Sequence, residues 1–388
     1  MPQYDTHDEI EEKNRKKRKK RWAKFIVFIF ILTLAGFIYV TKELWLPKLK
    51  GLGDQYTTIV NDGRLAEGNF PITINGGAEY QLSCSENMLY VLSDASIYFY
   101  SDGGGIIKRR QHAYSNAIMD IVENRALLYE SGGYRFSVED RNDIIYEKEL
   151  EKNIMFVRLS PEGYTAVVTA SDTYDCEITV FDKDGSEIYN RKCVERVSDV
   201  SFINNSKGCV ISYIYAENGS LVTSVQETAF TESNAKWTSP GLDTFGLEVC
   251  GYDGGAAVIG IDACGYVDSN GQILSLYRYD GDFVGGSCEN GRSAVIINSN
   301  ETRKYEAALF DGSGESPLVL DFQSPLVDVA VVDGLAYIMT REAVYAYDFS
   351  GGLRSTAQID DSYTGFVRSS DYVFLKSFNK IDRINYES

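Results

Sequence analysis

The chain has 388 residues, of which 44% are apolar and 13% aromatic, so it is long enough to bury a large hydrophobic core. Residues 1–24 carry nine basic and five acidic side chains, and the other 29 basic and 51 acidic residues give the remainder a net charge of −22. That charge argues against nucleic acid as a partner. Two histidines and no CxxC pair argue against a metal site.

The N-terminal segment has the pattern of a membrane anchor. The basic stretch KNRKKRKKRWAK is followed from Phe25 to Val40 by sixteen residues without a charge. Extension to Leu46 gives about 22 residues, or roughly 33 Å of helix, which is enough to cross a bilayer. Trp22 and Trp45 flank this stretch, as interfacial aromatic residues do. We therefore expect one transmembrane helix over residues 22–46.

The positive-inside rule sets the orientation of this helix, because the basic residues precede it. It predicts a cytoplasmic basic tail over residues 1–21, a short linker over residues 47–56 and an extracytoplasmic domain over residues 57–388. A cleaved signal peptide is the alternative, but TKELWLPKLKG after Val40 has no small-x-small cleavage pattern. We expect a single-pass protein of the cell membrane.

The rest of the chain repeats one short pattern, a strand that ends in Asp and is followed by two residues and then Gly. The anchoring positions are spaced 37 to 46 residues apart, and they are Asp102, Asp140 in a weaker copy without the glycine, Asp182, a degenerate unit near Thr228, Asp268, Asp311 and Asp348. That period and the alternation of apolar and polar residues are typical of four-stranded propeller blades. Asp and Gly at this spacing suit the hairpin between a blade's third and fourth strands. Calcium binding is the alternative use of these aspartates, but DKDG lacks the further carboxylates of a calcium loop.

The two ends of the repeat region complement each other. The residues after the last anchor supply about three strands, and the segment FPITI, Phe70 to Ile74, precedes the first full unit. We expect this segment to pair with the last blade and close the ring. The sequence thus predicts an all-β propeller with eight blades, or seven if the degenerate unit is an insertion.

These features together resemble a known family. The basic tail, the anchor helix, the FPI-type entry strand and the aromatic-Asp-x-x-Gly hairpins are similar to bacterial membrane-anchored propellers of the domain-of-unknown-function 5711 family. The chain also resembles quinoprotein-type propellers more distantly. The resemblance covers nearly the whole chain, and it implies a fold and a membrane location but no catalytic residue or cofactor.

The domain offers few residues for catalysis. Its single histidine, His112, ends an outer-strand pattern, and neither HExxH nor GxSxG occurs in it. The basic cluster of Lys108, Arg109 and Arg110 fits a solvated edge strand better than a ligand patch. We assign no catalytic, cofactor-binding or metal-binding residue from the sequence.

One pair of cysteines lies in a hairpin of suitable length for a disulfide. If Asp184 and Gly185 form a two-residue loop in CEITVFDKDGSEIYNRKC, Cys176 and Cys193 lie directly opposite each other. A three-residue turn from Asp182 to Gly185 shifts the register by one residue and separates them. We predict the disulfide Cys176–Cys193. The pairing of the other five cysteines stays open: Cys84, Cys209, Cys250, Cys264 and Cys288.

The sequence favours a binding function over an enzymatic one. A rigid ring tethered by a short linker fits a scaffold that holds an extracytoplasmic protein or a cell-wall component at the membrane. The alternative is a lyase or hydrolase that acts on cell-envelope polymers through carboxylates at the propeller channel.

Overall fold

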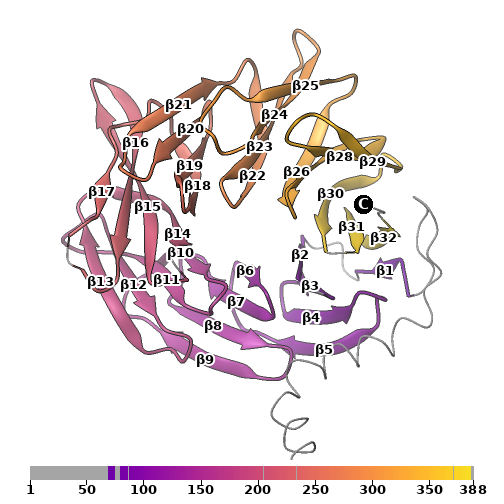
Figure 1. Ribbon diagram of the computed structural model, residues 1–388. Helices are drawn as coiled ribbons and strands as arrows, with labels where there is room; N and C mark the ends of the chain where they lie inside the picture. The colour runs from indigo at the N-terminus through magenta and orange to yellow at the C-terminus, as the bar shows by residue number, and fades with distance from the viewer. Residues whose placement is uncertain are drawn as a thin grey trace, which may run out of the picture. The chain divides into compact units, whose positions relative to one another are not determined.

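The computed structural model describes residues 69–74, 79–85, 87–203, 205–232, 234–369 and 371–385. All of them fall within one compact unit, Thr57–Ser388. These residues form 32 strands and no helix, in eight four-stranded antiparallel sheets arranged as blades around an axis (Figure 1). The predicted all-β propeller is confirmed, with eight blades and not seven. No helix among the described residues could cross a membrane, and the predicted tail, transmembrane helix and linker, residues 1–56, lie outside those residues.

Each of the first four blades is built from four consecutive strands. Blade 1 contains β2 (Gln81–Ser85), β3 (Met88–Leu92), β4 (Ser96–Ser101) and β5 (Ile106–Gln111). Blade 2 contains β6 (Ala117–Val122), β7 (Arg125–Glu130), β8 (Arg135–Asp140) and β9 (Ile144–Glu149). Blade 3 contains β10 (Ile154–Leu159), β11 (Thr165–Ala170), β12 (Cys176–Phe181) and β13 (Glu187–Cys193). Blade 4 contains β14 (Arg196–Ile203), β15 (Gly208–Glu217), β16 (Ser220–Ala229) and β17 (Trp237–Thr238).

The other four blades follow the same plan, except that the last one takes a strand from the start of the chain. Blade 5 contains β18 (Gly246–Tyr252), β19 (Gly255–Gly260), β20 (Ala263–Asp268) and β21 (Ile273–Arg278). Blade 6 contains β22 (Asp282–Glu289), β23 (Arg292–Ser299), β24 (Lys304–Phe310) and β25 (Leu318–Phe322). Blade 7 contains β26 (Leu326–Val332), β27 (Leu335–Thr340), β28 (Ala343–Asp348) and β29 (Leu353–Gln358). Blade 8 contains β30 (Tyr363–Arg368), β31 (Tyr372–Ser377), β32 (Lys380–Asn385) and β1 (Ile72–Thr73).

The pattern of burial explains why these segments fold as blades. A middle strand such as β19 is buried along its whole length, because both of its faces pack against neighbouring blades. An outer strand such as β5 alternates exposed and half-buried side chains, because it borders solvent. The hydrophobic clusters take their residues from two adjacent blades, as in the cluster that joins Val168 and Ile178 of blade 3 to Ile211 of blade 4. Adjacent blades therefore stabilise each other.

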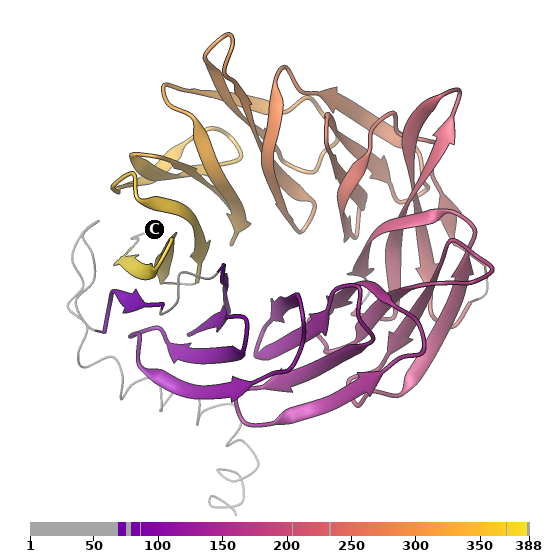
Figure 2. The ribbon, with the colours of Figure 1, turned by 180° about the vertical axis from the view of Figure 1, so that it is seen from behind.

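The ring closes where the sequence predicts. Ile72 pairs with Ile381 and Thr73 with Lys380, so β1 becomes the outermost strand of blade 8 beside β32 (Figure 2). Ile74 donates its N–H to the carbonyl of Asn379 at 2.9 Å. Ile72 and Ile381 are buried in a cluster that spans blades 8 and 1. The two ends of the propeller are thus joined in one sheet.

Candidate functional site

The innermost strands of the blades place polar side chains around a cavity on the propeller axis. The cavity has a volume of about 940 Å³ and is lined by first strands from blades 2 to 6. Arg158 on β10, Asp199 on β14 and Glu248 on β18 all face it. They come together because the first strand of each blade lies nearest the axis (Figure 1). Carboxylates at the channel are part of the enzymatic alternative drawn from the sequence, which does not indicate which acids they are.

Most of these polar groups join one blade to the next. Asp199 is buried; its Oδ1 accepts a hydrogen bond from Arg158 Nε at 2.8 Å, and its Oδ2 accepts one from the Val249 N–H at 2.9 Å. It therefore links blades 3, 4 and 5. Asp120 accepts the Leu159 N–H at 3.1 Å and so joins blades 2 and 3. These carboxylates are engaged in holding the ring together.

The same type of bridge recurs around the axis. Asp328 accepts the Phe366 N–H at 2.9 Å, which links blade 7 to blade 8. Gln81 of blade 1 accepts the Met119 N–H at 2.9 Å and donates to the Ala117 carbonyl at 2.7 Å. At both positions a side chain accepts a backbone N–H at the channel wall. These hydrogen bonds remove the free-energy cost of an unpaired buried N–H.

Burial controls the ionisation of these acids. It raises the pKa of Asp199 and of Asp120, although the positive charge of Arg158 acts in the opposite direction on both. It also raises the pKa of Asp328. Withdrawal from water thus outweighs the hydrogen bonds and the nearby cation at each position.

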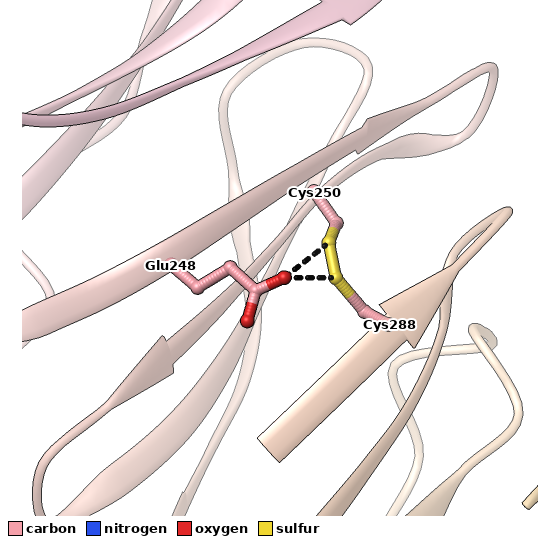
Figure 3. A group of neighbouring side chains, drawn as sticks. All are labelled: Glu248, Cys250 and Cys288. Carbon is pink, nitrogen blue, oxygen red and sulfur yellow. Dashed lines mark hydrogen bonds between the residues drawn. A yellow bond between two sulfur atoms is a disulfide. The ribbon is translucent and has the colours of Figure 1, made fainter. Parts of the chain in front are cut away.

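Glu248 differs from the other channel acids because its neighbours are sulfur atoms. Its Oε1 lies 3.5 Å from Cys288 Sγ and 3.8 Å from Cys250 Sγ (Figure 3). Burial, and to a lesser extent the negative charge of Asp199, raise the pKa of Glu248 to about 7 against the opposing charge of Arg158. A carboxyl group with this pKa exchanges its proton near neutral pH, which suits proton transfer or ligand binding.

A disulfide lies beside Glu248 and joins two blades. Cys250 on β18 is bonded to Cys288 on β22, with a Cα–Cα distance of 6.4 Å. The sequence alone leaves this pair open. The available signal was that the two residues are 38 positions apart, close to one blade period, and that both occupy first strands. Residues at equivalent places in successive blades become neighbours.

The structure places the predicted pair Cys176 and Cys193 directly opposite each other on β12 and β13. Both are buried thiols. A hydrogen bond between them lowers the pKa of Cys176 and raises that of Cys193, so their sulfur atoms are in contact. The disulfide between them stays a prediction.

The expected two-residue loop in that hairpin is wrong. The Asp182 carbonyl accepts the N–H of Gly185 at 3.0 Å, as in the longer turn. A bulge between Val180 and Phe181 then shifts the register by one residue and brings the cysteines back into opposition. The same shift occurs at this place in blades 1, 2, 5 and 7.

His112 and the basic cluster lie at the outer strand of blade 1. Lys108, Arg109 and Arg110 are on β5, and the Arg109 guanidinium stacks 5.3 Å from the centre of the Tyr98 ring. His112 Nε2 lies 2.9 Å from the carbonyl oxygen of Ser93. Arg110 also pairs with the buried Glu139 of blade 2. The cluster therefore packs against its own sheet and the next one.

Part of the propeller matches a known family. Residues 68–237 match DUF5711, a family of unknown function. The match covers blades 1 to 3 and part of blade 4, less than half of the chain. The DUF5711 resemblance drawn from the sequence is thereby confirmed, and no curated protein matches the chain.

Solved propellers share the fold of this chain at low identity. The computationally designed Ika8 protein has a TM-score of 0.62 at 12% identity, with 81% of this chain and 98% of that one covered. BamB from Moraxella catarrhalis has a TM-score of 0.53 at 12% identity and covers 81% and 97%. Chaetomium thermophilum Sqt1, bound to the N-terminus of a ribosomal protein, has a TM-score of 0.58 at 11% identity and covers 81% and 98%. These likenesses support the propeller fold and carry no information on function.

Proposed function

We propose that the chain is a membrane-tethered extracytoplasmic scaffold that binds a segment of a partner protein on one face of its propeller. The observation that carries the proposal is the unequal distribution of exposed apolar side chains between the two faces. One face of the propeller carries the connections from second to third strands and from each blade to the next. We call it the upper face. These connections emerge on the same side because successive strands of a blade are antiparallel.

Large apolar side chains are exposed in these connections. Phe378 and Val194 are each 71% exposed, and Ile261 is 54% exposed. Three aromatic residues on other connections of this face are also exposed, and they are Tyr134, Tyr174 and Phe245. The opposite face carries the Asp-x-x-Gly turns. Exposed apolar residues that gather on one face mark an interaction site.

A pocket of about 780 Å³ opens on the upper face between blades 8, 1 and 2. Phe378, Tyr80 and Tyr114 supply aromatic walls, while Glu79 and Asp94 supply acidic groups. Aromatic walls with a few polar groups suit a side chain or a short peptide segment. The Sqt1 propeller, which is bound to the N-terminus of another protein, provides a precedent for peptide binding by this fold.

The membrane tether rests on the sequence. The uncharged segment from Phe25 to Val40 follows a strongly basic stretch, so the proposed orientation places residues 1–21 in the cytoplasm and residues 57–388 outside. Protease added to intact protoplasts should degrade an epitope at the C-terminus and leave an N-terminal epitope intact. Survival of the C-terminal epitope would contradict this orientation.

Site-specific cross-linking tests the binding face. A photoreactive phenylalanine analogue placed at Phe378 in the full chain should form an adduct with one dominant protein in intact cells, identified by mass spectrometry. The matched control is Leu353, which is 51% exposed but lies on the outer strand β29. Equal adducts from both positions would refute a specific upper-face site. Saccharide adducts alone would show that a cell-wall polymer is the partner.

A lyase or hydrolase is the second candidate, and Glu248 is the observation that favours it. Its pKa of about 7 and its place on a cavity of about 940 Å³ suit a general acid. The neighbouring Asp120 and Asp199 already bind backbone groups of adjacent blades. Release of soluble fragments from cell-envelope polymers by the full chain, abolished in Glu248→Gln, would move the assignment to this enzyme.

A further inference from the structure

Glu248, Cys250 and Cys288 form the one group of potential metal ligands found among the described residues. Their three ligand atoms all lie within 4.8 Å of one another. The sulfurs come from two blades and the carboxylate points at both of them (Figure 3). The sequence shows no CxxC pair here because the ligands meet only when blades 5 and 6 stack.

We propose that reduction of the Cys250–Cys288 disulfide creates a site for a thiophilic divalent cation such as Zn²⁺, with both sulfurs and the Glu248 carboxylate as ligands. A dithiol reductant supplies two electrons and two protons, which break the S–S bond and leave two thiols, while the reductant becomes a disulfide. The cation then binds the two sulfurs as thiolates and releases their protons to water. The proton of a protonated Glu248 leaves in the same step.

The distances around Glu248 fit tetrahedral coordination. Zinc–sulfur bonds of about 2.3 Å and zinc–oxygen bonds of about 2.0 Å set the edges of such a site at about 3.5 Å for S···O and about 3.8 Å for S···S. The Glu248 oxygen already lies 3.5 Å and 3.8 Å from the two sulfurs. Only the sulfurs must separate once their bond is broken.

The surrounding strands allow that separation. The cysteine Cα atoms are 6.4 Å apart, near the long end of the 4.4–6.8 Å or so that disulfides span. Each cysteine lies on a separate strand, and both line the axial cavity of about 940 Å³. This cavity gives room for a water molecule as the fourth ligand. Three protein ligands and one water make up an open zinc site.

The ligands' own charges favour a cation. Of the neighbouring charges, Asp199 on β14 acts on Glu248 with a negative charge, and the Arg158 guanidinium paired with Asp199 offsets part of it. Two thiolates and a carboxylate would concentrate three negative charges in the channel wall. A divalent cation offsets most of that charge, so the reduced site is better satisfied with the metal than without it. The metal would also replace the disulfide as the link between blades 5 and 6.

Cobalt binding by the full chain tests the proposal. The protein is reduced with a phosphine, which takes up the oxygen of one water molecule, and is then titrated with Co²⁺ without oxygen. We expect one equivalent to bind, with sulfur-to-cobalt charge-transfer absorption, and Zn²⁺ to displace it. The unreduced protein should show no such absorption. Equal cobalt spectra from the reduced wild type and the Cys250→Ser variant would overturn the site.

Two further variants separate this site from the other thiols and from misfolding. Glu248→Gln keeps both cysteines. It should weaken Co²⁺ binding by at least roughly 10–100-fold, which is the effect of losing an outer-shell partner. Cys176→Ser, in the other close pair, should bind Co²⁺ like the wild type. Unchanged affinity in Glu248→Gln, with an unchanged thermal unfolding curve, would remove the carboxylate from the ligand set.

Discussion

Cys176 and Cys193 are the residues whose chemistry depends most on the compartment. They lie opposite each other in blade 3, are buried, and have their sulfurs in contact. In an oxidising extracytoplasmic compartment this geometry predicts a disulfide. It should add on the order of 3 kcal/mol to the free energy of unfolding, because the bond closes a loop of about 17 residues.

Non-reducing peptide mapping of protein taken from the cell surface checks this disulfide. We expect a peptide pair that joins Cys176 to Cys193 and separates on reduction. Cys193→Ser should lower the unfolding temperature, whereas serine at Cys84, a half-buried thiol on β2, should have a smaller effect. Free thiols at both positions would show that the disulfide does not form in the cell.

Asp328 and Asp348 have pKa values that shift in opposite directions, because burial dominates at the first and hydrogen bonds dominate at the second. Burial raises the pKa of Asp328, although it accepts N–H groups of Phe366 and Val329. Asp348 is half-buried at the end of β28, and the Ser350 hydroxyl and the Gly352 N–H hold its pKa well below its usual range. The two aspartates should therefore contribute to stability with opposite dependence on pH.

Urea unfolding at several pH values tests this difference. A raised pKa in the folded state means that Asp328 reduces stability as pH rises from about 4, the unfolded value, through the folded value. The Asp328→Asn variant should lose that decline, so its stability relative to wild type rises with pH. Asp348→Asn should behave in the opposite way, because a lowered pKa adds stability above about 4 that is lost in acid. Parallel pH profiles for both variants would contradict the role of burial.

The hairpin between third and fourth strands is the element that the sequence describes best. Asp182 accepts the N–H groups of Asp184 and Ser186, and Gly185 has a φ of +82°. A Cβ at Gly185 would lie 2.8 Å from Cγ of Tyr146 in the preceding blade. The glycine therefore serves two purposes, a left-handed backbone and a close contact between blades.

Alanine substitution separates these two contributions. Gly219 has a φ of +86°, but a Cβ there would meet nothing within 4 Å. We expect Gly219→Ala to cost about 1–2 kcal/mol of unfolding free energy from backbone strain alone. Gly185→Ala should cost about 1–3 kcal/mol more, from overpacking against Tyr146. Chemical denaturation measures both values, and equal losses would mean that Tyr146 moves aside freely.

The bulge that follows this turn shows the limit of prediction from local sequence. The Asp-x-x-Gly spacing indicates the turn, since both residue types act within a few positions of each other. The extra residue, Ile188 in β13, has no distinctive side chain. Twist and packing of the whole sheet determine where the register shifts. A count of residues between the cysteines therefore placed them opposite each other, but from the wrong loop.

At the scale of the ring, the repeat period predicted the number of blades, and the unmatched strands at each end predicted the closure. The Cys250–Cys288 bond and the place of Glu248 beside it could not be read in the same way. They depend on which first-strand residues of successive blades face each other across a gap. That relation follows from the tilt and spacing of blades, to which no short sequence pattern corresponds.

The closing strand β1 offers a direct test of how far the ring behaves as one unit. Ile72 is 6% exposed and packs in the cluster that holds Ile381 and Phe374, while the next residue, Thr73, is exposed. Because β1 contributes only two residues to the sheet, its attachment depends largely on this one side chain. A charge at Ile72 should detach β1, whereas the same charge at Thr73 stays in water.

We therefore expect Ile72→Asp to lower the unfolding free energy by at least about 3 kcal/mol, since it removes a buried aliphatic group and buries a carboxylate. Thr73→Asp should stay within about 0.5 kcal/mol of wild type. Detachment of β1 exposes the edge of β32, so the first variant should also aggregate on warming. Thermal unfolding followed together with light scattering measures both effects. Matching curves for the two variants would mean that blades 8 and 1 stay joined without β1. The hydrogen bonds from the Tyr80 hydroxyl to the Ser377 and Lys380 carbonyls, at 2.7 and 3.1 Å, would then be sufficient to close the ring.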